Sequence, residues 1–297
     1  MKNNPLHISI IIIGYNTMST LKKSLESIDK LIVTNHMIEV IYVDDGSVDD
    51  SFEMFTNYNL KFNKNQFKLG NNGGRSRARL EGVKMASGEW LLFLNSNIVA
   101  ESNLILNYYK SILNKNSYAY GGSVNYSSTD CVFEKYLNAS TRGIKKYKDN
   151  QNINYQNLLF SNCLIKKSIF DFIQFNLDLK GYGGEELDFA LKLEKKFPKM
   201  MVASKGAVVT RINSPDYKEH LYKLMEFGEL NLNCLDNQLK NDVIKFNILL
   251  KKNILFKGLV NLLYYVCRRC YKIKFISNYI IRVGMLSAIL KGYYRIK

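Results

Sequence analysis

Hydrophobic runs alternate with helical periodicity in the first hundred residues. Residues 8–13 form a continuous run rich in β-branched side chains, which is typical of a strand buried on both faces. A helical spacing of apolar positions follows, at Leu21, Leu25, Ile28 and Leu31. The pattern predicts further strands at residues 39–43, 67–69 and 90–94, and a helix at 75–85. Strands and helices that alternate at this spacing predict parallel βαβ units in a doubly wound sheet.

The second half of the chain continues as α/β and then becomes helical. Strands are expected at residues 118–126 and 158–165, with further strands at Val202 and at Val208–Val209, and a helix runs from Gly181 to about Lys196. From about Pro215 the pattern is helical. The expected organisation is an α/β domain over residues 1–235, made of halves 1–113 and 114–235, followed by a basic amphipathic helical tail over residues 236–297.

Positive charge is concentrated in the tail. The formal net charge is +16, but residues 245–297 hold twelve Lys and Arg and no acidic residue, which leaves +4 on residues 1–242. A nearly balanced body with a basic tail argues against nucleic-acid binding, which requires a basic surface on the folded domain. Five scattered Cys indicate reduced thiols and a cytoplasmic location, and no run of about 20 apolar residues predicts a membrane span.

The tail combines an apolar stripe with basic and aromatic residues. The predicted stripe consists of Phe256, Leu259, Leu263, Val266 and Cys270. The basic residues around it include Lys251, Lys252, Lys257, Arg268, Arg269, Lys272 and Lys274. Such helices favour contact with an anionic membrane surface, here the inner face of the cell membrane. The alternative is that the stripe packs on the body of the protein.

Polar residues follow the predicted strands, at Gly14–Tyr15, Asp44–Asp45, Gly73 to Arg79, and Asn95–Ser96–Asn97. In a doubly wound sheet the carboxyl ends of the strands form the ligand site, so these residues should converge. Asp44 or Asp45 could accept hydrogen bonds from a base or a ribose, although an Asp-Asp-Gly-Ser turn is also ordinary between a strand and a helix. Arg75 and Arg79 share one face at the start of a helix and suit a diphosphate, or else form a solvated basic face.

Residues 181–188 (Gly-Tyr-Gly-Gly-Glu-Glu-Leu-Asp) are the most informative local motif. Its glycines allow a ligand to approach the backbone closely. Two adjacent carboxylates at the start of a helix suit a general base beside a group that binds hydroxyls. Alternatively, acidic residues simply stabilise the first helical turn.

Taken together, these segments resemble family 2 glycosyltransferases of the GT-A fold, over about residues 6–235. The matching segments occur in the family's order at residues 8–16, 43–47, 72–79, 86–97 and 181–186. The likeness is greatest to bacterial members that build surface polysaccharide. The resemblance implies a GT-A, Rossmann-like, mostly parallel sheet with flanking helices. It also implies transfer of a sugar, with inversion, from a nucleotide-sugar donor, expected to be a UDP-sugar, to a glycan or lipid-linked acceptor.

The resemblance also implies roles for individual residues. Tyr15 and Asp44 or Asp45 would hold the nucleoside, with Asn95 and Asn97 at the nucleotide and Arg75 and Arg79 beside the diphosphate. Glu186 stands where the family has its catalytic base, usually Asp. Tyr182, Gly184 and Glu185 would contact the acceptor or the donor sugar.

Two departures concern the metal, because Mn²⁺ or Mg²⁺ is usual in the family. The Asp-x-Asp motif that binds it stands here as Asn95-Ser96-Asn97, which leaves Asn97 as the remaining candidate ligand. A hard cation prefers carboxylates to neutral amides. The family's later His is replaced by Thr210 or Arg211. Either Arg75, Arg79 or Arg211 neutralises the leaving diphosphate without a metal, or the chain binds nucleotide sugar without turnover. The retained Glu185–Glu186 pair favours the first explanation.

Overall fold

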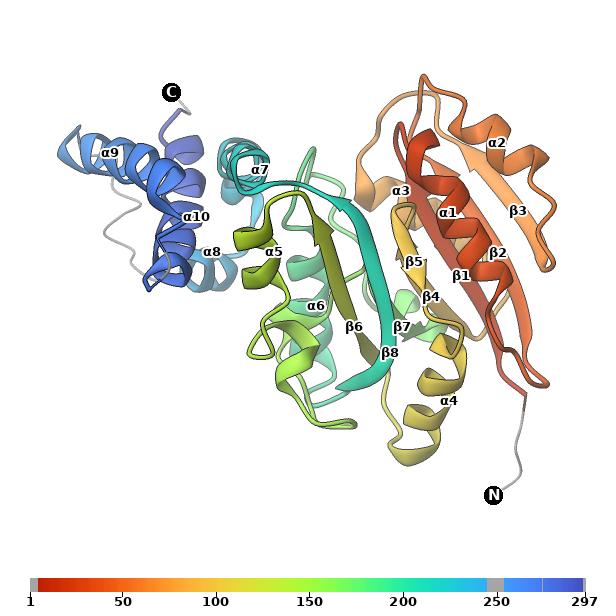
Figure 1. Cartoon of the computed structure of the whole chain (residues 1–297). Helices are drawn as coiled ribbons and strands as arrows, with labels where there is room; N and C mark the ends of the chain where they lie inside the picture. Colours follow the sequence, from red (N-terminus) through yellow and green to blue (C-terminus); the bar gives the residue numbers. More distant parts are fainter. Residues whose placement is uncertain (1–4, 245–253, 274, 296–297) are drawn as a thin grey trace.

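The computed structural model describes residues 5–244, 254–273 and 275–295, and its centre is a single sheet (Figure 1). Eight strands form this sheet in the order β3-β2-β1-β4-β7-β6-β8-β5. The strands are β1 (His7–Gly14), β2 (Met37–Asp44), β3 (Asn63–Lys68), β4 (Trp90–Asn95), β5 (Ile98–Ala100), β6 (Ala119–Ser128), β7 (Asn162–Lys166) and β8 (Met201–Ser214).

Parallel pairing predominates, which confirms the predicted α/β fold. The pairs β1–β2, β1–β4, β2–β3 and β6–β8 are parallel, whereas β4–β7, β6–β7 and β5–β8 are antiparallel. Several predicted strand boundaries were wrong. The strand expected over residues 158–165 is β7, which begins only at Asn162. The third strand begins at Asn63, not Phe67, because its mostly polar side chains lie along the edge of the sheet. The strands expected at Val202 and Val208 form one strand, β8, whose register shifts opposite Gly122 and Ser123.

Helices cover both faces of the sheet, and the alternating side chains of β1 explain why its run is continuously apolar. Ile8, Ile10 and Ile12 pack under α1, α2 and α4, whereas Ile11 and Ile13 pack under α3 and α6. The helices of the body are α1 (Met18–Asp29), α2 (Ser51–Asn57), α3 (Arg75–Met85), α4 (Leu104–Asn114), α5 (Cys131–Leu137), α6 (Glu185–Lys196) and α7 (Tyr217–Leu230). Short 3-10 turns η1 (Gly143–Lys146), η2 (Tyr155–Asn157), η3 (Lys167–Asp171) and η4 (Leu232–Cys234) connect them.

The C-terminal helices α8 (Asn237–Ile244), α9 (Ile254–Cys270) and α10 (Ser277–Tyr293) lie at the end of the molecule beyond α5 and α7 (Figure 1). Helix α10 lies against α7 through small residues. A Cβ atom at Gly228 would meet the Ile289 backbone, and one at Gly292 would meet the Met225 backbone. The tail therefore packs on the body through α10, and not through the stripe predicted on α9.

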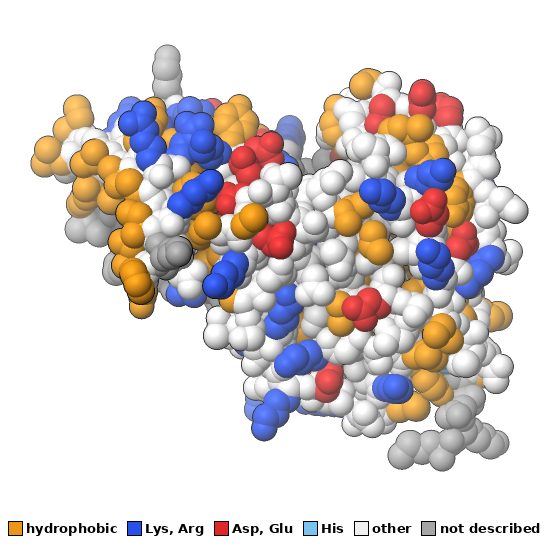
Figure 2. Space-filling model, in the orientation of Figure 1, with side chains coloured by type: hydrophobic (Ala, Val, Ile, Leu, Met, Phe, Trp, Pro, Cys, Tyr) orange, Lys and Arg blue, Asp and Glu red, His pale blue; other side chains and the backbone are white. Residues whose placement is uncertain are grey.

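The buried face of α9 differs from the stripe expected. Val260, Tyr264 and Cys267 are buried, whereas Leu259 and Val266 of the predicted stripe are 49% and 47% exposed. Hydrophobic side chains gather along the outer edge of these helices, with Lys and Arg beside them (Figure 2). Lys251, Lys252 and Lys274 lie outside the described residues. No helix within the described ranges is long and apolar enough to cross a membrane.

Candidate functional site

The loops that follow β1 and β2 are joined by hydrogen bonds. The Asn16 N–H donates to Ser47 Oγ at 2.8 Å, and the Val48 N–H donates to Asn16 Oδ1 at 3.0 Å. Gly46 has φ +77°, and a Cβ atom there would lie 2.4 Å from the Asn71 backbone, so the turn requires glycine. Tyr15 is held at the rim of this region with 44% of its surface exposed, where its ring can stack on a ligand.

The two aspartates after β2 are buried and have different partners. Asp44 accepts hydrogen bonds from the Ser47 N–H at 2.6 Å and the Tyr42 hydroxyl at 3.2 Å. The Asp45 carboxylate accepts from the N–H groups of Gly73 at 2.8 Å and Gly74 at 3.1 Å. Burial raises the pKa of Asp45, although these backbone donors oppose the shift. Asp45 thus shapes the glycine loop before α3, and it also lines the cavity in front of that loop.

Arg79 holds both glutamates at the start of α6. It is 1% exposed, and its guanidinium donates to Glu185 Oε1 at 3.2 Å and to Glu186 Oε1 at 3.0 Å. Arg75 lies 3.5 Å from Glu185 Oε1 and keeps 34% of its side chain exposed. The sequence predicted that both arginines flank a diphosphate. The arrangement favours that role for Arg75 alone, since the buried Arg79 is fully engaged by the two carboxylates.

The two glutamates differ in their titration. Burial would raise the pKa of Glu185, but the Arg75 and Arg79 guanidinium groups outweigh it and hold that pKa below its usual value. Burial raises the pKa of Glu186, and the charge of Glu185 adds to the shift while Arg79 opposes it. The Glu185 side chain is 5% exposed and that of Glu186 is 21% exposed. Glu186 is therefore the more basic carboxylate and the one that a substrate can reach.

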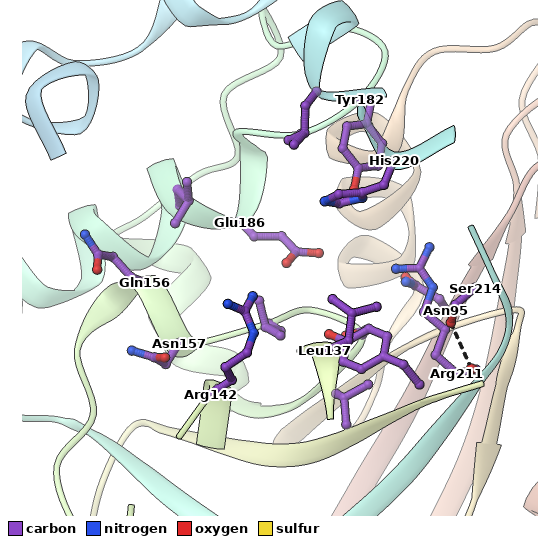
Figure 3. Close-up of a pocket in the computed structure, with 18 of the residues that line it drawn as sticks. Asn95, Leu137, Arg142, Gln156, Asn157, Tyr182, Glu186, Arg211, Ser214 and His220 are labelled. Carbon is purple, nitrogen blue, oxygen red and sulfur yellow. Dashed lines mark hydrogen bonds between the residues drawn. The ribbon is translucent and has the colours of Figure 1, made fainter. Parts of the chain in front are cut away.

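Two cavities meet beside these residues. The strand-end cavity, of about 480 Å³, lies at the carboxyl ends of β1, β2 and β4 and is lined by Tyr15, Asp45 and Asn97 among others. The Glu186 cavity, of about 450 Å³, lies between β6, η1, α6 and α7. Four residues line both cavities: Arg75, Asn95, Tyr182 and Arg211. Glu186 and Gly184 line only the second cavity, in which Figure 3 shows Glu186 together with Asn95, Tyr182 and Arg211 of the shared wall.

Arg75, Arg211 and Lys223 gather at the junction, where Glu185 and Glu226 are the nearby carboxylates. Arg211 lies on β8 opposite Ile98, and its buried Nε has no hydrogen-bond partner. Burial lowers the pKa of His220 to about 3, and the charges of Arg211, Lys223 and Arg142 act in the same direction. Burial also lowers the pKa of Lys223, assisted by Arg211 and Arg75. The junction is consequently suited to an anion.

The residues at the expected metal position do not fit a divalent cation. The Asn97 side-chain amide donates to the Ile212 carbonyl at 3.2 Å, and the Asn97 backbone carbonyl accepts the Ile212 N–H at 2.9 Å. Arg211 supplies fixed positive charge to the same cavity. Among the described residues, no group of three or more His, Cys, Asp or Glu is arranged to bind a metal ion. Hard cations bind oxygen ligands and prefer carboxylates. Asn95 and Asn97 offer only neutral amide oxygens.

Several residues that complete the site are not part of any motif in the sequence. His220 and Lys223 come from the interior of a helical segment, and Arg142 precedes a 3-10 turn. The ring of Tyr182, a predicted site residue, has two cations near it. Arg75 Cζ lies 5.0 Å and Lys223 Nζ lies 5.9 Å from the ring centre. Only the packing of α7 against the Gly181–Gly184 loop brings Lys223 and His220 to this position. Asn231 fixes that loop by donating to the Gly183 carbonyl at 2.7 Å.

The sheet, the strand-end cavity and the buried carboxylate at a glycine-rich helix start define a nucleotide-sugar transferase fold of the GT-A type. The family model for glycosyl transferase family 2 matches residues 9–173, more than half of the chain, so the chain belongs to this family.

Known relatives agree with this assignment. The glycosyltransferase GlyG of Streptococcus pneumoniae is 28% identical over 181 residues, which are 57% of this chain and 60% of GlyG. A poly(ribitol-phosphate) β-glucosyltransferase of Bacillus spizizenii is 30% identical over 106 residues, 35% of this chain and 17% of the relative. The chain thus spans less than two thirds of either relative's length.

A solved structure confirms the fold. The structure of Staphylococcus aureus TarS residues 1–349 in complex with UDP-GlcNAc has a TM-score of 0.59 to this chain at 16% identity, and the match covers 98% of this chain and 92% of that one. At that identity the likeness establishes the GT-A fold alone.

Proposed function

We propose that this protein transfers a sugar from a nucleotide-sugar donor, a UDP-sugar, to a hydroxyl of an acceptor with inversion, and that Glu186 is the general base. The observation that carries the proposal is the pair of cavities that meet at Arg75, Asn95, Tyr182 and Arg211. The donor would occupy the strand-end cavity, with Tyr15 and Asp45 at the nucleoside. The acceptor would occupy the Glu186 cavity.

The chemistry requires one base and one stabilised leaving group. The acceptor oxygen bonds to the anomeric carbon as the bond from that carbon to the diphosphate oxygen breaks. The hydroxyl proton passes to the Glu186 carboxylate, and the bonding electrons remain on the nucleoside diphosphate. A base is needed because a sugar hydroxyl is a weak nucleophile until it loses its proton. The raised pKa of Glu186 makes its carboxylate a stronger base. Glu185 has both Arg75 and Arg79 as partners and is not free to attack the sugar, which supports direct displacement.

We further propose that the reaction needs no metal ion. Arg211, with Arg75 and Lys223, would take the position of the cation beside the leaving diphosphate. Fixed guanidinium groups bind phosphate oxygens in pairs and carry their charge at any physiological pH. Two observations support this proposal: no group of three or more His, Cys, Asp or Glu among the described residues is arranged to bind a metal ion, and the buried Arg211 Nε has no hydrogen-bond partner.

A panel of nucleotide sugars tests these proposals together. Thermal stability is measured with each nucleotide sugar, with EDTA and with Mn²⁺, and product formation is followed by mass spectrometry. We expect a UDP-sugar to raise the melting temperature and to be consumed in EDTA. Strict dependence on Mn²⁺ would contradict the metal-free mechanism. Binding without any turnover would favour the alternative that the chain has lost catalysis.

We also propose that the C-terminal helices place the protein peripherally on the cytosolic face of the cell membrane, where surface polysaccharide is assembled. Phe275 and Tyr279 are 97% and 72% exposed, and Arg268, Arg269 and Lys272 are exposed near them in the sequence. Aromatic side chains beside basic ones suit an anionic lipid surface.

Sedimentation with liposomes tests this contact. The variant Phe275→Ser/Tyr279→Ser should lose binding to liposomes that contain phosphatidylglycerol. The control is Met37→Ser, which removes an apolar residue of the body that is 59% exposed. This variant should retain liposome binding. Equal binding by both variants would contradict the proposal. Point substitutions are preferable to truncation here, because α10 packs closely on α7.

A further inference from the structure

Two cationic side chains line the Glu186 cavity alone and do not reach the strand-end cavity proposed for the donor. Arg142 and Lys145 line this cavity but not the strand-end cavity. The Arg142 guanidinium stacks on Tyr136, 4.0 Å from the ring centre, and no ion pair joins it to a carboxylate among the described residues. Lys145 donates to Asn138 Oδ1 at 3.0 Å. Both side chains are partly buried, so their charge is incompletely solvated.

Arg142 points into the cavity toward the reacting group. Figure 3 shows Arg142 and Glu186 entering from opposite walls, with Gln156 and Asn157 beside Arg142. Tyr126 lines the same cavity; burial raises the pKa of its hydroxyl, and the charges of Arg211, Glu186 and Arg142 also act on it. An anion bound by Arg142 would therefore lie near a hydroxyl that Glu186 deprotonates.

Much of the remaining wall of the cavity is apolar. This part comes from β6, α5, α7 and α10, through Val124, Phe133, Leu137, Leu224, Met285 and Ile289. A partly buried guanidinium that has no ion-pair partner among the described residues is available to an anionic ligand in this cavity. The Glu186 cavity thus combines apolar walls with a cation that can bind an anion.

We propose that Arg142 is a specificity-determining residue that binds a phosphate group of the acceptor. The inference rests on the proposed function, because it takes the Glu186 cavity as the acceptor site. Arg142 is held in orientation by Tyr136, and its planar fork can donate two hydrogen bonds to one phosphate. The phosphate could belong to a lipid carrier, whose chain the apolar walls would contact, or to a polyol-phosphate chain.

Binding measurements separate these sources without requiring turnover. The full chain, saturated with UDP so that the strand-end cavity is filled, is titrated with a short prenyl phosphate, with the matching prenyl alcohol and with ribitol phosphate. The variants are Arg142→Gln, Arg142→Lys and the control Lys146→Gln. Lys146 is exposed on the same turn and lies outside the cavity.

At least one phosphate ligand should bind to the wild type, and Arg142→Gln should weaken it roughly tenfold to a hundredfold, as expected for one charge-assisted contact. Arg142→Lys should be intermediate, and Lys146→Gln should match the wild type. Preference for prenyl phosphate or for ribitol phosphate identifies the source. The proposal is overturned if prenyl alcohol binds as well as prenyl phosphate, if neither phosphate binds, or if Arg142→Gln changes nothing. Binding of UDP itself reports separately on the proposed function.

Discussion

Substitution of Arg79 tests whether one buried guanidinium organises the two carboxylates. Arg79→Met keeps an unbranched stem but removes the guanidinium, so Glu185 and Glu186 lose their shared partner and the contact with Phe160 is lost as well. Arg79 is 1% exposed and Glu185 is 5% exposed, so solvent cannot replace the lost contact. Removal of one member of a buried pair typically costs about 3–5 kcal/mol, which should lower the melting temperature on the order of 10 °C.

The assay is chemical denaturation of Arg79→Met, Glu185→Gln and the double variant. In the double variant the uncompensated charge of Glu185 is gone, so part of the stability should return, with a coupling energy of at least about 1 kcal/mol. Because the pKa of Glu185 is held below 4.5, the stabilisation by Arg79 is present above that pH and is lost as pH falls through the lowered pKa. Additive effects within about 0.5 kcal/mol, or a loss that does not depend on pH, would refute this reasoning.

Three further predictions concern activity and the donor site. The raised pKa of Glu186 predicts that kcat/KM decreases as pH falls through a value above 4.5, and an acid limb at or below 4.5 would contradict the assignment. Asp45→Ala removes the acceptor of two backbone N–H groups, so urea denaturation should show a loss of about 1–3 kcal/mol together with weaker UDP binding. Arg211→Gln should lower kcat roughly 10²- to 10³-fold while the Kd of the donor changes far less, as for a group that stabilises the leaving charge. A weaker donor Kd with unchanged kcat would instead indicate a role in binding alone.

The sequence predicted the central strands because burial on both faces leaves a direct signal. The run Ile8 to Ile13 could only belong to a covered strand, and β4 gave a similar signal. Strand β3 has no such pattern, because it pairs on one side only and exposes polar side chains such as Asn63 and Asn65. Its position depends on backbone pairing with β2, which amino-acid type does not encode.

The candidate site was predictable where one segment carries the chemistry. Glu185, Glu186 and the glycines before them form one motif, and the structure brings them to Arg75 and Arg79 as the topology of the sheet requires. The role of Arg79 was not predictable, because side-chain burial decides between a phosphate and a carboxylate partner. Arg142, Lys223 and His220 reach the site only through packing of α7 and of the segment after α5. The buried face of α9 was mispredicted for the same reason, since several apolar faces of that helix are possible.

The most direct test of the central claim is transfer by Glu186→Gln under single-turnover conditions, at donor concentrations that saturate the enzyme. The variant keeps the shape of the side chain and can still accept a hydrogen bond from Arg79, but it cannot take up a proton at neutral pH. We predict that UDP-sugar binding is retained within a few-fold and that transfer falls roughly 10²-fold or more, whereas Asp171→Asn, a control at an exposed carboxylate that lines neither cavity, transfers normally. Transfer at near the wild-type rate by Glu186→Gln would contradict this prediction.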